Sequence, residues 1–335
     1  MHFLYASDEG FSTVLKASLH SLLEAHAESE ITVHIIGENL SSTTINSIEA
    51  LVDRFGKVVD FVAMPDFTML LGRDVDTRRF TLSALSRLFV DSLIDVAVDR
   101  IIYLDCDTIV KISLDRLWNF DLQGAVIGAV NDCRNWRYLA HLGLSRRDVY
   151  INSGVLLIDL VRFRAESWQD RFRHAIVTYD GLLEFPDNDL ICMLMQERLA
   201  VLPPEFNVIS PVRMCSFAEV MTLRRPTVYY DRRDVEQART APAILHYTTF
   251  FGVRGRPWHE GYDDQDGALF RQHLSATGGS LRPAVKLSLL KQWSVRALKS
   301  PVRPLALFVF GFAHSVAKPS MSLATRTRIR AAQKG

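Results

Sequence analysis

Along the first 104 residues, short apolar runs alternate with longer stretches in which apolar residues recur every three or four positions. The short runs are typical of buried strands and lie at residues 3–6, 31–36, 58–64 and 101–104. The longer stretches begin at residues that cap helices, first Ser12 and then Ser41 or Ser42. This alternation predicts an α/β protein with a Rossmann-like, mostly parallel sheet flanked by helices on both faces.

Beyond residue 104 the alternation becomes less regular. Further strands are predicted at residues 124–130, 151–160 and 243–245, and a helix at 187–198. An earlier helix is predicted at residues 79–95 and carries Arg87. Prolines then break the chain into loops and short elements, and we find no internal repeat.

The net charge of +1 conceals a division of charge along the chain. The 27 basic and 38 acidic residues up to Asp266 sum to −11, whereas 12 basic and no acidic residues follow it. Leucines and aromatic residues accompany these basic residues, a combination that suits an anionic membrane surface. We therefore predict a folded domain over residues 1–265 and a basic, amphipathic helical tail over residues 266–335 that associates with such a surface.

Composition excludes several other classes of protein. A hydrophobic content of 48% excludes a disordered chain, and four scattered cysteines provide neither a disulfide framework nor a zinc motif. The first residues lack the charged and apolar regions of a signal peptide. The longest apolar run of the tail, residues 305–316, would span about 18 Å as a helix, short of the roughly 30 Å hydrocarbon core. We expect no membrane-spanning segment, a reducing compartment and no nucleic-acid partner, because the short arginine run near the end is weak evidence for one.

Two carboxylates, Asp105 and Asp107, follow the apolar run 101–104. Residues two positions apart point to the same side of an extended chain, and α/β folds bind ligands at the carboxyl ends of their strands. Such a pair suits a divalent cation that bridges the oxygens of a diphosphate. Asp is also common where strands end in turns, but the four apolar residues upstream favour the cation site.

The same segment fits the nucleophile loop of haloacid-dehalogenase-like phosphatases. In this alternative Asp105 is the phosphorylated nucleophile and Asp107 acts as acid and base. Such a loop normally lies near the start of its domain, whereas here the alternating strands and helices of residues 1–104 precede it.

Six segments in order along the chain resemble the motifs of glycosyltransferase family 8. They are Tyr5 to Asp8, Leu82 to Leu88, Leu104 to Asp107, Tyr150 to Ile158, Pro186 to Asp189, and His246 with Arg256 to His259. The resemblance covers about residues 1–262 and is closest to the bacterial lipopolysaccharide galactosyl- and glucosyltransferases of the family. It implies a GT-A fold, a UDP-hexose donor, manganese and retention of anomeric configuration.

At the nucleotide end the resemblance assigns four residues. Asp8 would accept a hydrogen bond from the uracil ring, Phe11 would cover the base, and Ala6 would contact it through its main chain. Arg87 would lie over the donor, near the sugar and the phosphates. Gly10 departs from the family, whose members often carry Asn near the ribose.

The resemblance implies that Asp105, Asp107 and His246 hold the metal, with Asp105 also close to the ribose or the sugar. An imidazole beside two carboxylates favours Mn²⁺ over Mg²⁺, which stays the alternative ion. The loop after His246 is longer than the family pattern, and Arg256 stands where Lys is usual. Arg256 would still neutralise the diphosphate, while Gly252 or Gly255 would allow the backbone to approach it closely.

The donor hexose is assigned to two further segments. Asn152 and Ser153 would contact the sugar, and Asp187 would bind its hydroxyl groups. Asn188 takes the place where many relatives have Gln, close to the reactive carbon, and Asp189 is placed in the donor site beside it. Asp187 and Asn188 are therefore the candidate catalytic residues.

The sequence thus predicts a retaining, manganese-dependent glycosyltransferase. It would move galactose or glucose from a UDP-sugar to a lipopolysaccharide or another lipid-linked surface glycan, in the cytoplasm at the inner face of the plasma membrane. Two alternatives stay open, the phosphatase described above and a non-catalytic, membrane-bound adaptor with a degenerate GT-A domain.

Overall fold

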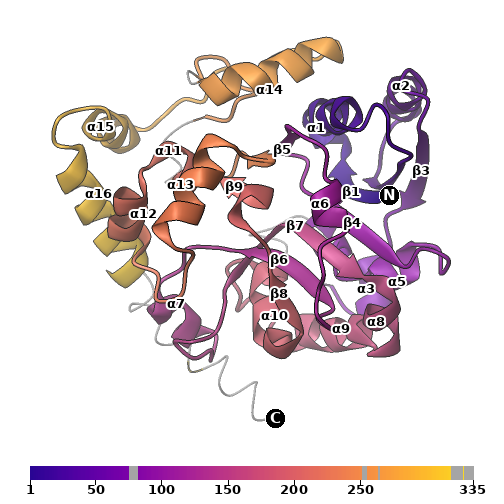
Figure 1. Ribbon diagram of the computed structural model, residues 1–335, viewed down its shortest axis with the longest axis horizontal. Helices are drawn as coiled ribbons and strands as arrows, with labels where there is room; N and C mark the ends of the chain where they lie inside the picture. The colour runs from indigo at the N-terminus through magenta and orange to yellow at the C-terminus, as the bar shows by residue number, and fades with distance from the viewer. Residues whose placement is uncertain (75–81, 251–254, 263–264, 318–326, 328–335) are drawn as a thin grey trace.

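The centre of the protein is a seven-stranded sheet with the strand order β3-β2-β1-β4-β7-β6-β8 (Figure 1). The structure is a computed structural model that describes residues 1–74, 82–250, 255–262, 265–317 and 327. The strands are β1 (His2–Asp8), β2 (Thr32–Glu38), β3 (Val58–Ala63), β4 (Arg100–Leu104), β6 (Ile127–Asn131), β7 (Ile151–Asp159) and β8 (Leu199–Val201). β7 runs antiparallel to both of its neighbours, and the other adjacent pairs are parallel. The predicted mostly parallel sheet is confirmed.

The two faces of the sheet bury two separate clusters of apolar side chains. Because side chains alternate along a strand, Phe3 and Tyr5 of β1 pack on one face with α1 (Ser12–Ala25) and α2 (Ser42–Asp53). Leu4 lies in the cluster on the opposite face. The helices that supply this second cluster are α3 (Phe67–Leu71), α4 (Leu82–Ser86), α5 (Val90–Leu93), α7 (Trp136–His141), α8 (Leu160–Ala165), α9 (Trp168–Thr178) and α10 (Pro186–Leu194). Helices therefore cover both faces, as predicted.

A second, three-stranded sheet lies beside the first. It consists of β5 (Thr108–Val110), β10 (Ile244–His246) and β9 (Val208–Ile209). β10 pairs antiparallel with β5, which places His246 opposite Thr108. This small sheet brings a residue from late in the chain next to the segment that follows β4.

The predicted helix at residues 79–95 is wrong as a single element. Within the described residues it forms α4 and α5, and Arg87 lies in the break between them. The Arg87 Nε donates to the carbonyl of Ala84 at 2.9 Å, so this side chain turns back into the protein instead of following a helix surface. The predicted helix at 187–198 is shorter, since α10 ends at Leu194 and a 3₁₀ turn at Gln196–Arg198 leads from it into β8.

The first helix also begins differently from the prediction. Asp8 accepts from the amide of Phe11 at 2.8 Å and caps a short 3₁₀ turn, which leads directly into α1 at Ser12. Ser41, one of the two predicted caps, does accept from the amide of Thr44 at the start of α2.

In the described residues of the basic C-terminal part, the α-helices are α14 (Gln265–Ala276), α15 (Leu289–Leu298) and α16 (Arg303–Phe312), which a π-helical turn extends to Ala317. Figure 1 shows α14 at the edge of the molecule near α1, and α16 beside α12 (Phe217–Arg224). Phe270 and Leu274 of α14 are buried in the same cluster as Phe3. The predicted division of the chain at residue 265 stays a prediction, but the hydrophobic core continues past it.

The remaining helices connect these layers. They are α6 (Asp115–Trp118), α11 (Ser210–Met214) and α13 (Arg232–Thr240). Among the residues that the structure describes, no helix combines the length and the apolar character needed to cross a membrane.

The contact between α16 and α12 can be tested at Gly311. A Cβ at this position would lie 2.7 Å from the carbonyl oxygen of Leu223 and 2.8 Å from that of Thr222. We expect Gly311→Val to lower the free energy of unfolding by about 1–3 kcal/mol through overpacking, although Val is no poorer a helix former than Gly. Leu305→Val, on the exposed side of the same helix, should change it little. Equal melting temperatures for the two variants would contradict this packing.

Candidate active site

Strands of the large sheet bring polar residues together at one edge. β1 and β4 run parallel, so Asp8 at the end of β1 and Asp105 just after β4 lie at the same edge. β7 runs in the opposite direction, and its first residues therefore reach that edge too. The amide of Asp105 donates to the carbonyl of Gly154 at 2.8 Å.

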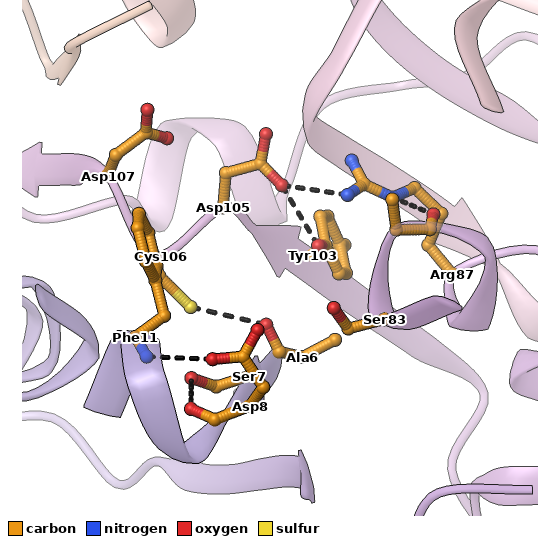
Figure 2. Close-up of a pocket in the computed structure, with 11 residues that line it drawn as sticks. Ala6, Ser7, Asp8, Phe11, Ser83, Arg87, Tyr103, Asp105, Cys106 and Asp107 are labelled. Atoms are coloured by element: carbon orange, nitrogen blue, oxygen red, sulfur yellow. Dashed lines mark hydrogen bonds and ion pairs between the residues drawn. The ribbon is translucent and has the colours of Figure 1, made fainter. Parts of the chain in front are cut away.

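A cavity of about 220 Å³ opens at this edge (Figure 2). Its lining comprises Ala6, Ser7, Asp8, Phe11, Ser83, Ala84, Arg87, Tyr103, Asp105, Cys106 and Asp107. Figure 2 shows the carboxylates of Asp105 and Asp107 at one end of this group, and Asp8 with Phe11 at the other. The cavity thus connects the end of β1 to the two carboxylates after β4.

Asp105 is held by a buried arginine and a buried tyrosine. Its Oδ1 lies 2.9 Å from Nη2 of Arg87 and accepts from the Tyr103 hydroxyl at 2.9 Å (Figure 2). The Arg87 guanidinium is 5% exposed and stacks on the Tyr103 ring, 4.2 Å from its centroid. Burial raises the pKa of Tyr103 well above its ordinary value, so this hydroxyl keeps its proton and acts as a donor. These two donors therefore fix the orientation of the Asp105 carboxylate.

Asp107 interacts with a histidine and a second arginine. Its Oδ1 lies 3.0 Å from Nε2 of His246, and its Oδ2 accepts from Nη1 of Arg256 at 2.9 Å. Burial would raise the pKa of Asp107, but His246 and Arg256 outweigh it and lower that pKa to about 2. Burial would conversely lower the pKa of His246, but Asp107 and Asp105 raise it. The two carboxylates thus favour positive charge at His246.

The orientation of the His246 ring follows from a chain of hydrogen bonds. The amide N–H of Gly154 donates to Oδ1 of Asn152 at 3.1 Å, and Nδ2 of Asn207 donates to the same oxygen at 2.8 Å. Oδ1 of Asn207 therefore faces Nδ1 of His246, at 2.9 Å, and accepts a hydrogen bond from the N–H at that position. Nε2 is left pointing at the two carboxylates, which is the arrangement a metal ligand requires.

These three side chains fit a divalent cation. Asp105, Asp107 and His246 each offer one ligand atom, and the three atoms lie within 4.8 Å of one another. Space beside them depends on the absence of a side chain at Gly154, where a Cβ would lie 2.2 Å from Cε1 of His246 and 2.7 Å from Oδ2 of Asp105. Two carboxylate oxygens and an imidazole nitrogen suit Mn²⁺ better than Mg²⁺.

The predicted sugar-binding residues gather next to Arg87. The hydroxyl of Ser153 donates to Oδ2 of Asp187 at 2.5 Å, and the amide of Ser153 donates to Oδ1 of Asn188 at 2.7 Å. Nη1 of Arg87 lies 3.3 Å from Oδ2 of Asp187 and donates to the Ser153 carbonyl at 2.8 Å. The start of α10 is thereby fixed to the start of β7.

Asp189 lies in a different environment from its neighbours. It is fully buried, and its oxygens accept from the hydroxyls of Tyr138 and Tyr150 and from the amides of Glu184 and Phe185. Burial raises its pKa to about 6. These contacts hold Asp189 within the protein at the start of α10, and its predicted place in the donor site stays a prediction.

At the other end of the cavity, Phe11 forms part of an aromatic wall. Its ring meets the ring of Trp258 edge-on at 5.5 Å, and the guanidinium of Arg282 lies over it at 5.6 Å. The carbonyl of Ala6 accepts from the Cys106 thiol at 3.2 Å, which ties β1 to the residue between the two aspartates.

Gly252 or Gly255 was predicted to let the backbone approach the diphosphate closely. Gly252 lies outside the described residues, so the choice between Gly252 and Gly255 stays open.

Three residues with clear roles at the site were not predicted. Tyr103 and Asn207 hold Asp105 and His246, and the absence of a side chain at Gly154 makes room for both of these side chains. Tyr103 stands within an apolar run and Asn207 in a proline-rich loop, so nothing in the local pattern marked either. Gly154 does stand out, because glycine in a strand often marks a close approach.

Residues 2–261 match the family model described as Glycosyl transferase family 8. Among curated proteins, General stress protein A of Bacillus subtilis is 25% identical over 251 residues, which are 74% of this chain and 85% of that protein. Lipopolysaccharide 1,2-glucosyltransferase of Escherichia coli is 27% identical over 177 residues, 52% of this chain and 48% of that protein. This chain therefore matches about half the length of the second relative.

Two crystal structures of LgtC share the fold. An active-site mutant aligns with a TM-score of 0.69, and the galactosyltransferase in complex with donor and acceptor sugar analogs aligns with a TM-score of 0.65. Each is 21% identical and covers 87% of this chain and 98% of its own. The predicted GT-A fold is confirmed.

The space at Gly154 provides a test of the metal site. We expect Gly154→Ala to weaken Mn²⁺ binding about tenfold or more, because the new methyl group would displace the His246 ring or the Asp105 carboxylate. Titration calorimetry with Mn²⁺ in the presence of UDP measures this affinity.

The matched control is Gly128→Ala, which crowds Leu122 and Leu202 in the core instead. It should lower the melting temperature and leave the Mn²⁺ affinity unchanged. Wild-type Mn²⁺ affinity in Gly154→Ala would contradict the proposed ligand geometry.

Proposed function

The chain belongs to glycosyltransferase family 8, and we propose that it transfers galactose or glucose from a UDP-sugar to a lipopolysaccharide or another surface glycan, with Mn²⁺ and with retention. The observation that carries the proposal is the cluster of Asp105, Asp107 and His246 at one end of a cavity whose other end is formed by Asp8 and Phe11. A nucleoside diphosphate has the same layout, with a planar base at one end and anionic phosphates at the other.

In this proposal the base lies near Asp8 and against the ring of Phe11, and the diphosphate lies near the two aspartates. A divalent cation held by Asp105, Asp107 and His246 would stabilise the negative charge of the departing UDP. Arg256, paired with Asp107 at 2.9 Å, adds a guanidinium that can donate two parallel hydrogen bonds to phosphate oxygens. Both effects act where charge develops as the bond from the anomeric carbon to the diphosphate breaks.

The sugar would lie beside Ser153, Asp187 and Asn188. Oδ2 of Asp187 accepts from Ser153 and pairs with Arg87. Because these contacts compensate its negative charge, this carboxylate is poorly suited to attack carbon. Asn188 offers an uncharged amide, which can stabilise an oxocarbenium-like sugar without bonding to it. These contacts favour a front-side mechanism, in which the departing phosphate takes the proton of the acceptor hydroxyl, over a double displacement through Asp187.

The names of the relatives support a glycan acceptor. The E. coli relative is a lipopolysaccharide 1,2-glucosyltransferase, and LgtC is a galactosyltransferase. This evidence leaves the donor as either UDP-glucose or UDP-galactose.

The C-terminal helices support a lipid-linked acceptor. α15 exposes Leu289, Leu290 and Trp293, and α16 exposes Leu305 and Phe308, in a part of the chain that contains no acidic residue. We place these helices on the anionic cytoplasmic surface of the plasma membrane, where such an acceptor would be presented.

The two alternative functions differ in their support. The phosphatase reading needs Asp105 as a free nucleophile, but family membership opposes it and Arg87 with Tyr103 already engages one carboxylate oxygen. A non-catalytic adaptor would bind UDP without turnover, which the next experiment distinguishes.

We expect the protein to release UDP from one UDP-hexose when Mn²⁺ is present, and EDTA to abolish the release. Asp107→Asn should lower the rate at least a hundredfold, about 2.7 kcal/mol in transition-state stabilisation, because it removes an anionic metal ligand. Coupled detection of UDP measures the rate.

Asp170→Asn makes the same chemical change at an exposed position on α9 and should have no effect. UDP binding without release from any UDP-sugar would favour the adaptor. Phosphorylation of Asp105, with no UDP binding, would favour the phosphatase.

Membrane association is tested at the most exposed apolar residues of α15. Leu290 is 78% and Trp293 67% exposed. Replacing both with Ser should weaken sedimentation with vesicles of phosphatidylglycerol and phosphatidylcholine about a hundredfold or more, since each apolar side chain buried in the interface contributes about 1.5–3 kcal/mol. Val161→Ser, exposed on α8, should bind as wild type does. Equal binding by all three proteins would contradict this surface.

A further inference from the structure

A second group of metal-binding side chains lies on α1 and α14, apart from the donor site. His20 and Glu24 are one helical turn apart on α1, and His273 comes from α14. Each offers one ligand atom, and the three atoms lie within 4.8 Å of one another. The family roles described above use none of these residues.

The two imidazoles already have the geometry of paired ligands. Nδ1 of His20 lies 3.0 Å from Nδ1 of His273, and the Oε2 of Glu24 lies 3.5 Å from the same nitrogen of His273. Two nitrogens bound to one tetrahedral zinc ion at about 2.0–2.1 Å would be separated by only slightly more than this. In the present contact one ring donates its Nδ1 proton to the other, so ion binding requires that ring to hold its proton on Nε2 instead.

The surroundings form an enclosed site with one opening. His20 and His273 are each only 5% exposed, whereas Glu24 reaches solvent and provides an entry for the ion. The ring of Phe55 packs edge-on against His20 at 5.7 Å and supports its orientation.

The carboxyl ends of the two helices also favour a cation at this site. Glu24 lies in the last turn of α1, which ends at Ala25, and His273 lies in the last turn of α14, which ends at Ala276. The carboxyl end of a helix carries partial negative charge and favours a nearby cation. Both helices thus present this end to the same site.

We propose that His20, Glu24 and His273 bind a zinc-type divalent cation that fastens α14 to α1, with water as a fourth ligand. Two histidines and one carboxylate are an established set of protein ligands for Zn²⁺. The ion is separate from the one assigned to Asp105, Asp107 and His246, and it needs no UDP.

Such a fastening would act on the wall of the donor cavity. Phe270, one turn before His273, packs against Trp258 at 5.4 Å and against Tyr247 at 5.5 Å. Trp258 in turn contacts Phe11, and Tyr247 follows the ligand His246 directly. Holding α14 in place therefore holds the segment that carries Arg256 and Trp258.

The experiment uses the full chain with Asp107→Asn, which impairs the first site, after removal of metals with EDTA. Competition with a chromophoric chelator measures Zn²⁺ binding, and Co²⁺ reports four-coordinate geometry through its visible absorption. We expect one equivalent of tightly bound Zn²⁺, intense Co²⁺ bands and a higher melting temperature with Zn²⁺.

Adding Glu24→Gln should weaken this binding tenfold or more, and adding His273→Gln should abolish it together with the Co²⁺ bands. Glu24→Gln keeps the length of a half-exposed side chain, so this variant should fold as the parent does. The control is His174→Gln, which replaces a histidine at an exposed position. Absence of bound Zn²⁺ in Asp107→Asn, or equal binding in all these variants, would overturn the proposal. Neither result bears on UDP release by the wild-type chain.

Discussion

The proposed donor site depends on the contacts that the Arg87 guanidinium makes. It lies in the break between α4 and α5 and contacts Asp105 after β4, Ser153 on β7 and Asp187 at the start of α10. It is 5% exposed, and these partners compensate the cost of burying its charge. Removing one partner of such a buried pair costs about 3–5 kcal/mol. One side chain therefore aligns the proposed metal ligands with the residues proposed to hold the sugar.

Asp107 is held in place by a different part of the chain, the segments that carry His246 and Arg256. β10 pairs with β5 and brings His246 to Asp107, while Asn207 fixes the tautomer of the imidazole. Arg256 reaches the same carboxylate from the following segment, which α14 supports through Phe270. The region after residue 240 thus contributes to the donor site and to the core, and the proposed zinc site on α1 and α14 would stabilise this arrangement.

Much of this could be predicted from the sequence, because alternating strands and helices have strong periodic patterns. The strands of the parallel part, the cap at Ser41 and the pair Asp105 and Asp107 are all local features. In the small sheet, the apolar run 243–245 predicted β10, whereas β5 and β9, of three and two residues, have no pattern of their own and form because the tertiary fold pairs them with β10. The break between α4 and α5 at Arg87 was also missed, since the partners of Arg87 lie far away in the sequence. The burial of Asp189 against Tyr138 and Tyr150 could not be predicted either, because these partners lie on α7 and near β7, far from it in the sequence.

The most direct test of the central claim is an electron paramagnetic resonance titration of free Mn²⁺ with the wild-type protein, with and without UDP. The account predicts that UDP causes the protein to take up one further equivalent of Mn²⁺, because the diphosphate and the three side chains bind the ion together. A loss of free Mn²⁺ signal with protein and UDP no larger than the sum of the losses that each causes alone would contradict it.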